Sequence, residues 1–291
     1  MAQASRRSMS SPTERSPTPS RQRTELAIGQ ALTLGALHGP AELLPISSSG
    51  HVALIPWLLG WNYDRLDPEL RKAFEVALHA GTAAALLITL RSEVQDALQG
   101  MSFRLAGLIG LSFVPPAVVG LTLERQIEQR LGTPATTAAG LICGSIAMVW
   151  ADRAPQTRSS LEAGAVDALW LGGAQACALI PGVSRNGATL AAARMRRFTR
   201  EDANRLSRHV ALPVIAGATL LKTVRVGRRG LPPGTALPFA AGAAASFVST
   251  LISTRVITAV ERDRSFTPYV VYRLALATAV AAKGSRGRRS G

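Results

Sequence analysis

Charged residues are scarce in this chain of 291 residues: Asp, Glu, Lys and Arg make up 18% of it, against 47% hydrophobic residues. None of the four occurs in residues 105–123, 133–151 or 231–254. About 20 consecutive apolar residues suffice for a helix to cross a bilayer. So many windows of this length argue against a soluble domain and predict an all-α, polytopic integral membrane protein. Further candidate spans are residues 74–90, 168–183, 209–221 and 266–282.

Cysteine is also nearly absent. Cys143 and Cys177 each lie within an apolar window, and the chain has no CxxC pair. A disulfide framework or a cysteine-ligated metal requires such pairs or clusters. Both cysteines are therefore expected to be packing residues.

Acidic residues are few relative to basic ones, 18 against 33, which gives a formal charge of +15. A nucleic-acid-binding domain would gather these charges on one folded face. Here they lie near the chain ends and between apolar windows, which suits contact with anionic lipid headgroups. We therefore expect a lipid bilayer as the partner surface and no nucleic acid.

Composition divides the chain into three parts. Residues 1–23 are rich in Ser, Pro and Arg and lack apolar periodicity, which predicts a disordered basic N-terminal tail. Residues 24–282 are expected to form a single membrane domain. Residues 283–291 form a short basic C-terminal tail.

Polar residues interrupt the apolar segment at 36–56, ALHGPAELLPISSSGHVALIP. An ionisable side chain in such a run costs roughly 2.5–3.5 kcal/mol at the centre of a membrane helix. Polar backbone is tolerated at that depth only inside the protein or along a wet cavity. The segment therefore indicates a site within the membrane domain. Its candidate residues are Glu42, Ser47, Ser48, Ser49 and His51.

A second broken segment, QACALIPGVSRNGAT at 175–189, has the same character. Glycines allow backbone N–H groups to approach an anion, and a helix N-terminus adds partial positive charge. Arginine suits bidentate binding of phosphate. The candidate residues for a phosphate clamp are Ser184, Arg185, Asn186 and Gly187.

The two segments align when Pro45 is paired with Pro181, with one residue of slippage. Interrupted apolar segments in corresponding halves indicate an internal repeat, with the binding site where the halves meet. The halves would cover about residues 24–150 and 160–282. Two unrelated proline kinks are the alternative, since membrane helices tolerate them.

Facing each other, the two segments would set a carboxylate–histidine pair opposite a phosphate clamp. Phosphoryl transfer depends mainly on positioning and charge neutralisation, usually with a divalent cation. A ligand that reaches a site inside the bilayer is expected to be a lipid that carries phosphate or diphosphate.

The motifs ELLPISSSGH and PGVSRNGAT resemble the two signatures of the undecaprenyl-diphosphatase family, the type associated with bacitracin resistance. The resemblance covers roughly residues 26–282 and includes Tyr272-Arg273 in the last span. It implies an all-helical fold of inverted repeats with two re-entrant helix-loop-helix elements. It also implies hydrolysis of undecaprenyl diphosphate to undecaprenyl phosphate, which recycles the carrier for peptidoglycan and other cell-wall polymers. The location would be the bacterial cell membrane, with the site open to the extracytoplasmic side.

Carried over by motif position, the resemblance makes Glu42, His51 and Arg185 the catalytic residues. Ser47 and Ser48 match motif serines, and with Ser49, Ser184, Asn186 and Gly187 they would bind phosphate. Glu42 would handle a metal or a proton, and His51 would act as general acid/base or transient nucleophile. Helix capping alone is the alternative for Ser47, Ser48 and Ser184.

The chain departs from the family pattern at His38, which stands where the motif has its first glutamate. The family resemblance implies Mg²⁺ or Ca²⁺, held by Glu42 with His38 as a further candidate ligand. Such hard cations prefer oxygen ligands, so the histidine sets this chain apart. His79 and His209 are expected to be structural.

Two other functions stay open from the sequence. A polyprenyl-phosphate transporter or flippase would also have broken helices in inverted repeats. An inactive paralogue would result if His38 disables the site. A homo-oligomer is compatible with all three.

Overall fold

The computed structural model describes residues 26–229, 233–260 and 265–289. The tail predicted at residues 1–23 lies outside these described ranges. Within them every regular element is a helix, and one isolated bridge joins Arg158 to Phe198. The prediction of an all-α fold is confirmed.

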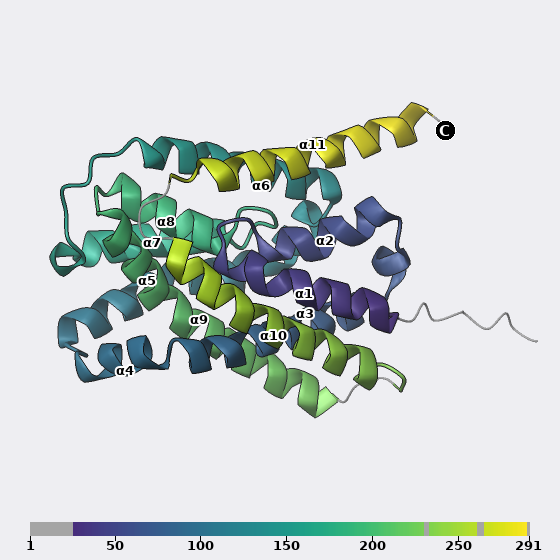
Figure 1. The fold of residues 1–291 in the computed structure, drawn as a ribbon, viewed down its shortest axis with the longest axis horizontal. Coiled ribbons are helices and arrows are strands. Elements are labelled where there is room, and N and C mark those ends of the chain that lie inside the picture. The colour runs from purple at the N-terminus through teal and green to yellow at the C-terminus, as the bar shows by residue number, and fades with distance from the viewer. Residues whose placement is uncertain (1–25, 230–232, 261–264, 290–291) are drawn as a thin grey trace, which may run out of the picture.

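The helices fall into two consecutive sets (Figure 1). The first contains α1 (Ile28–Leu43), α2 (Ser48–Leu59), η1 (Asn62–Arg65), α3 (Pro68–Thr89), α4 (Arg91–Gln99), α5 (Phe103–Leu131) and α6 (Pro134–Asp152). The second contains η2 (Ser160–Glu162), α7 (Ala165–Cys177), α8 (Arg185–Met195), α9 (Arg200–Arg229), α10 (Ala236–Val260) and α11 (Thr267–Arg289). The boundary predicted between the halves falls between α6 and α7. Residues 283–289 of the predicted C-terminal tail continue α11 instead of leaving it, and Lys283 donates to the Trp57 carbonyl of α2 at 2.6 Å.

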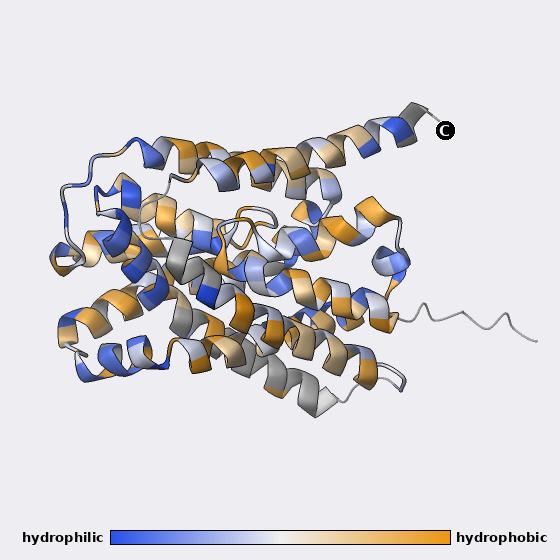
Figure 2. Ribbon diagram, viewed as in Figure 1, coloured by the Kyte–Doolittle hydropathy of each residue, from blue (hydrophilic) through white to orange (hydrophobic). Residues whose placement is uncertain are grey.

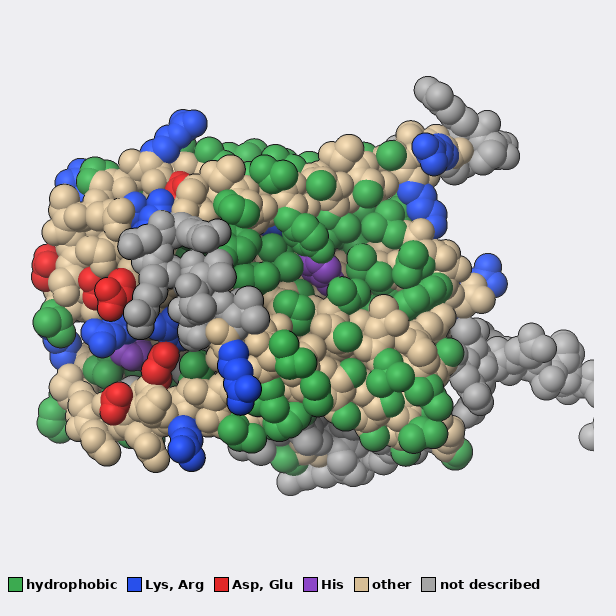
Figure 3. Space-filling view, viewed as in Figure 1, with side chains coloured by type: hydrophobic (Ala, Val, Ile, Leu, Met, Phe, Trp, Pro, Cys, Tyr) green, Lys and Arg blue, Asp and Glu red, His purple; other side chains and the backbone are tan. Residues whose placement is uncertain are grey.

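Three helices of the described part are long and apolar enough to cross a membrane: Phe103–Leu123, Pro134–Asp152 and Ala236–Arg255. They coincide with the three uncharged windows of the sequence, whereas the further candidate spans at 74–90, 168–183, 209–221 and 266–282 are not among them, and helix α7 ends at Cys177 within one of these. Large apolar side chains on them are exposed, for example Leu121, Ile146 and Ile252. On the face drawn in Figure 3, hydrophobic side chains occupy a wide area of the surface, and Figure 2 shows apolar residues distributed along most of the helices. An apolar exterior of this extent fits a lipid environment.

Close helix packing holds the first half of the site in place. A Cβ atom added at Gly35 or Gly39 of α1 would collide with α10, and one at Gly81 of α3 would collide with the α10 backbone at Ala243. Small residues at helix interfaces let backbones approach in this way within membranes. Helices α1, α3 and α10 therefore form one tightly packed group. This packing brings the polar residues of α1 close to those of α3.

The two halves exchange helices, so that the first α-helix of each half packs on a long helix of the other half. Helix α10 of the second half packs on α1, and α5 of the first half packs on α7. A Cβ at Gly172 of α7 would meet Ser112 and Pro115 of α5. This exchange supports the predicted two-half organisation. The inverted orientation of the halves and the re-entrant path of the two loops through a bilayer stay predictions.

A charged cluster outside the predicted spans ties η2, α7 and the end of α8 together. The Asp167 carboxylate accepts hydrogen bonds from Arg158 at 2.9 and 3.1 Å, from Arg196 at 2.6 Å and from the Gly164 amide at 3.0 Å. Burial opposes ionisation of Asp167, yet these hydrogen bonds lower its pKa to about 2. Because the ionised form is favoured in the fold, Asp167 stabilises the fold above about pH 4 and loses this contribution as the pH falls towards 2.

Asp167→Asn is expected to lower the free energy of unfolding by about 1–3 kcal/mol at neutral pH, the range for hydrogen bonds to charged groups. Thermal unfolding in detergent at pH 7 and at about pH 3 measures the effect, and the difference from wild type should shrink at the lower pH. Glu162→Gln is the matched control. The Glu162 carboxylate also faces Arg158, but it is exposed and lies 3.8 Å away, which is too far for a hydrogen bond. Equal losses in the two variants would contradict this role of Asp167.

Candidate active site

The first broken segment forms a helix-loop-helix element from α1 and α2. Helix α1 ends at Leu43, one residue after Glu42, and α2 begins at Ser48. Ser47 precedes α2 with φ of 75°, and its hydroxyl accepts a hydrogen bond from the Gly50 amide at 3.2 Å. A positive φ in a residue other than glycine costs about 1–3 kcal/mol and persists where the surroundings impose it.

The second broken segment has the same local geometry. Helix α7 ends at Cys177 and α8 begins at Arg185. Ser184 has φ of 70°, and its hydroxyl accepts from the Gly187 amide at 3.2 Å. The matching strained serine caps support the predicted internal repeat, including its one-residue slippage. They also show that Ser47 and Ser184 do cap helices, the alternative considered for them.

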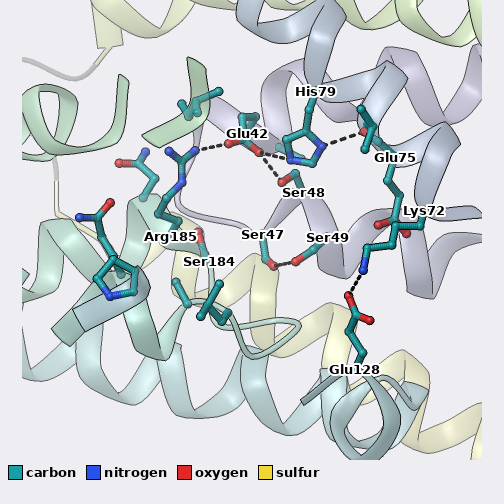
Figure 4. Close-up of a pocket in the computed structure, with 18 residues that line it drawn as sticks. Glu42, Ser47, Ser48, Ser49, Lys72, Glu75, His79, Glu128, Ser184 and Arg185 are labelled. Carbon is teal, nitrogen blue, oxygen red and sulfur yellow. Dashed lines mark hydrogen bonds and ion pairs between the residues drawn. The ribbon is translucent and has the colours of Figure 1, made fainter. Parts of the chain in front are cut away.

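The two loops meet, as the sequence predicted. Arg185 forms an ion pair with Glu42 (Figure 4). The Asn186 side chain donates to the Leu43 carbonyl at 2.5 Å. Glu42 also accepts a hydrogen bond from the Ser48 hydroxyl at 2.5 Å. Residues from the two halves of the chain thus form one polar cluster around the Glu42 carboxylate.

This cluster lines a cavity of about 290 Å³. The first residues of α2 and α8 face it, so two helix N-termini contribute their partial positive charge. Its wall also includes apolar side chains such as Leu179 and Ile215. A cavity with hydroxyls and a guanidinium at one place and apolar groups at another suits an anion attached to a hydrocarbon. The predicted residues that line it are Glu42, Ser47, Ser48, Ser49, Ser184, Arg185 and Asn186.

A charged pair on the cavity wall joins α3 to α5. Lys72 donates to Glu128 at 2.7 Å, and both residues line the cavity together with Glu75 (Figure 4). These three residues are not among those predicted from the sequence. Glu75 is the single charge within the apolar window 74–90, which could have singled it out, whereas Lys72 and Glu128 are each one of several charges in a stretch outside such a window.

His51 lies beside the cavity and is not among its lining residues. Its Nδ1 contacts the Ser47 carbonyl at 2.6 Å, and its Nε2 contacts the Tyr272 hydroxyl at 2.6 Å. A carbonyl only accepts, so Nδ1 carries the proton and Nε2 accepts from Tyr272. Gly187 is buried against Met148 and Pro45 and is also absent from the cavity wall.

Tyr272→Phe is expected to lower the turnover of the site about tenfold, because it removes the hydrogen bond that orients His51. Initial rates of the purified protein on the substrate that the family resemblance implies measure the effect. Tyr63→Phe is the matched control, since the Tyr63 hydroxyl is buried and has no hydrogen-bond partner in the described part of the chain. A Tyr272→Phe variant as active as the Tyr63→Phe variant would show that the contact is not needed.

Arg273 of α11 lies beneath both loops and is fully buried. It donates to the Pro45 carbonyl of the first loop at 3.0 Å and to the Gly182 and Val183 carbonyls of the second at 3.1 Å. It therefore joins the two loops through their backbones. From the sequence, Arg273 stands out only as part of the family resemblance. The signal that could have found it is a single charge within the apolar window 266–282, which is costly in a membrane.

His79 of α3 also belongs to the site, contrary to the expectation that it is structural. Its Nε2 lies 3.8 Å from the Glu42 carboxylate, and the ring packs edge-on against His38 at 4.5 Å between centroids. One ligand atom from each of His38, Glu42 and His79 lies within 4.8 Å of the other two. These three residues, here called the His38–Glu42–His79 cluster, could hold a metal ion. His209 is not part of the cluster found in the described residues, and its structural role stays a prediction.

Comparison with known proteins identifies relatives of this chain. The family described as Bacitracin resistance protein BacA matches residues 31–279. An undecaprenyl-diphosphatase of Pelobacter propionicus is 40% identical over 264 residues, which cover 86% of this chain and 94% of the relative. An undecaprenyl-diphosphatase of Geobacter sulfurreducens is 39% identical and one of Rubrobacter xylanophilus 34%; each alignment covers 88% of this chain, with 97% and 98% of the relative.

Proposed function

The chain belongs to the bacitracin resistance protein BacA family, and on that premise we propose that it hydrolyses undecaprenyl diphosphate. The products are undecaprenyl phosphate and inorganic phosphate. The reaction returns the lipid carrier to peptidoglycan and cell-wall synthesis, and it confers resistance to bacitracin.

The observation that best supports this proposal is the contact between Arg185 and Glu42 inside the cavity. It joins a cation and an acid from loops 143 positions apart in the chain. Hydrolysis of a diphosphate needs a positively charged group next to the non-bridging oxygens, which carry negative charge. It also needs an acid–base group close to the attacked phosphorus. The cavity provides both in one place.

Each predicted residue has a role that fits its position. Arg185 binds the diphosphate in a bidentate manner, Ser49 donates its hydroxyl at the start of α2, and Ser48 holds the Glu42 carboxylate beside the diphosphate. Ser47 and Ser184 shape the loops through their caps, so that backbone N–H groups face the anion. Asn186 holds the two loops together, and Gly187 permits the close packing below them. Glu42 handles the proton or the metal, and His51 serves as acid/base through the Tyr272 hydroxyl, which donates to its Nε2 and orients it.

A divalent cation is part of the proposal, as the family resemblance implies. The His38–Glu42–His79 cluster is the metal-ligating group found in the described part of the chain, and two of its members line the cavity. A bound cation there supplies positive charge to the phosphate oxygens. Two imidazoles and one carboxylate are a poor match to Mg²⁺ or Ca²⁺, which prefer oxygen ligands.

The apolar part of the cavity wall and the apolar exterior suit a lipid substrate in a bilayer. We propose the bacterial cell membrane as the location, with the cavity open to the extracytoplasmic side. The basic residues between the helices would contact anionic headgroups. A homo-oligomer is compatible with the exposed apolar faces.

The test uses the purified full chain in detergent with undecaprenyl diphosphate and a series of divalent cations. We expect inorganic phosphate and undecaprenyl phosphate to appear in equal amounts, and a chelator to stop the reaction. The polyprenyl-phosphate transporter is the alternative. Lipid movement across vesicles without phosphate release under any condition would favour it and contradict the proposal.

A further inference from the structure

The His38–Glu42–His79 cluster has an unsatisfied buried lone pair. His38 is 1% exposed, and its Nε2 atom has no hydrogen-bond partner in the described structure. A buried polar atom without a partner costs about 1–3 kcal/mol. An atom of this kind beside Glu42 and His79, which line the cavity, is suited to bind a ligand.

A chain of hydroxyls fixes which nitrogen of His38 carries the proton. Ser246 donates to the Leu78 carbonyl at 2.9 Å, so it must accept from Thr82, 2.7 Å away. Thr82 in turn accepts from His38 Nδ1 at 2.9 Å. Because this series of hydrogen bonds ends on a carbonyl, which can only accept, the proton of neutral His38 is on Nδ1. Its Nε2 therefore has a free lone pair.

His79 is oriented in the same way. Its Nδ1 lies 2.8 Å from the Glu75 carbonyl and donates to it, which leaves Nε2 as an acceptor. That Nε2 is 3.8 Å from a Glu42 oxygen, beyond hydrogen-bond range. Two acceptors thus face each other with a gap. Ligands about 2.1 Å from one ion lie roughly 3.4 Å apart in tetrahedral geometry, so the gap is close to that of a bridging cation.

The surroundings of the three ligands match those of known metal sites in proteins. A metal-bound histidine usually donates its other N–H to a carbonyl or a hydroxyl network, as both histidines do here. Glu42 is itself held by Ser48 and Arg185. Glu42 and His79 line the cavity, so a further coordination position would open onto it.

We infer that His38, Glu42 and His79 form a site for a borderline divalent transition ion of the Zn²⁺ type, in place of Mg²⁺ or Ca²⁺. Imidazole nitrogens favour Zn²⁺ and its neighbours, whereas Mg²⁺ and Ca²⁺ take oxygen ligands. The inference rests on the proposed function for the use of the metal, but metal binding itself can be measured without turnover.

The experiment measures metal bound to the purified, chelator-treated full chain in detergent, by equilibrium dialysis and elemental analysis. Zn²⁺ is titrated in millimolar Mg²⁺. We expect one zinc per chain despite the excess of Mg²⁺. Cobalt, used as a coloured probe, is expected to show the visible absorption of a low-symmetry site. Zinc readily displaced by Mg²⁺, or no zinc bound, would overturn the inference.

Variants locate the site. His38→Gln and His79→Gln are each expected to weaken zinc binding at least about 100-fold, and Thr82→Val about 10-fold through the orientation of His38. His209→Gln is the matched control and should bind zinc like wild type. Zinc binding unchanged in both ligand variants would contradict the assignment.

A selectivity change separates ligation from a loss of folding. His38→Glu replaces one nitrogen by oxygen and is expected to weaken Zn²⁺ binding while strengthening Mg²⁺ binding. Misfolding cannot produce such opposite changes. Equal weakening of both ions would count against the site. A chain that binds zinc but releases no phosphate would refute the proposed function alone, and phosphate release with Mg²⁺ in a chain that binds no zinc would refute this inference alone.

Discussion

Arg185→Ala is expected to lower phosphate release from undecaprenyl diphosphate at least about 100-fold, on the scale of removing one transition-state charge contact. Arg185 is the cation that the structure places against Glu42 in the cavity. It also donates to the Ala211 carbonyl at 3.3 Å, which orients it from α9. The measurement is kcat and KM with the purified variant in detergent.

Arg185→Lys separates charge from geometry. Lysine keeps the positive charge but loses the planar fork that binds two oxygens at once. We expect it to recover only a small part of the lost rate. Arg104→Ala is the control, because that exposed arginine contacts the Ala163 carbonyl away from the cavity. An Arg185→Ala rate within a few-fold of the control would rule out the clamp.

Arg273→Leu is expected to have the largest effect on stability. The change leaves the carbonyls of Pro45, Gly182 and Val183 without this donor inside the protein. Each buried polar group left without a partner costs about 1–3 kcal/mol, so several kcal/mol are at stake. Thermal unfolding in detergent measures the loss, and failure to obtain folded protein agrees with it.

Arg273→Lys tests the same point in a milder form. Lysine can donate to some of the carbonyls, so its melting temperature should lie between those of wild type and Arg273→Leu. A Leu variant that melts like wild type would mean that the two loops hold their positions without Arg273.

Much of the site could be predicted from residue type and spacing. The three uncharged windows correspond to the three helices of the described structure that are long and apolar enough to cross a membrane. Such helices can be predicted from the length of an apolar run. The two broken segments predicted the contact between Glu42 and Arg185. Polar loops in apolar surroundings need hydrogen-bond partners, which only another polar segment or water can provide.

Other parts depend on packing that no local pattern contains. His79 reaches Glu42 only because glycines let α1, α3 and α10 pack closely. The tautomer of His38 depends on Ser246, which is 208 positions away in the chain. Arg273 joins both loops through backbone carbonyls. Every residue has a carbonyl, so the sequence does not reveal which carbonyls Arg273 contacts. These are long-range relations between helices.

A double-mutant cycle on phosphate release tests most directly whether two distant loops form one catalytic unit. Rates are measured for wild type, Glu42→Gln, Arg185→Ala and the double variant. If the residues act together, the double variant is about as slow as the slower single variant. If the two losses multiply, Glu42 and Arg185 act independently, and the site is not a single unit assembled from both halves of the chain.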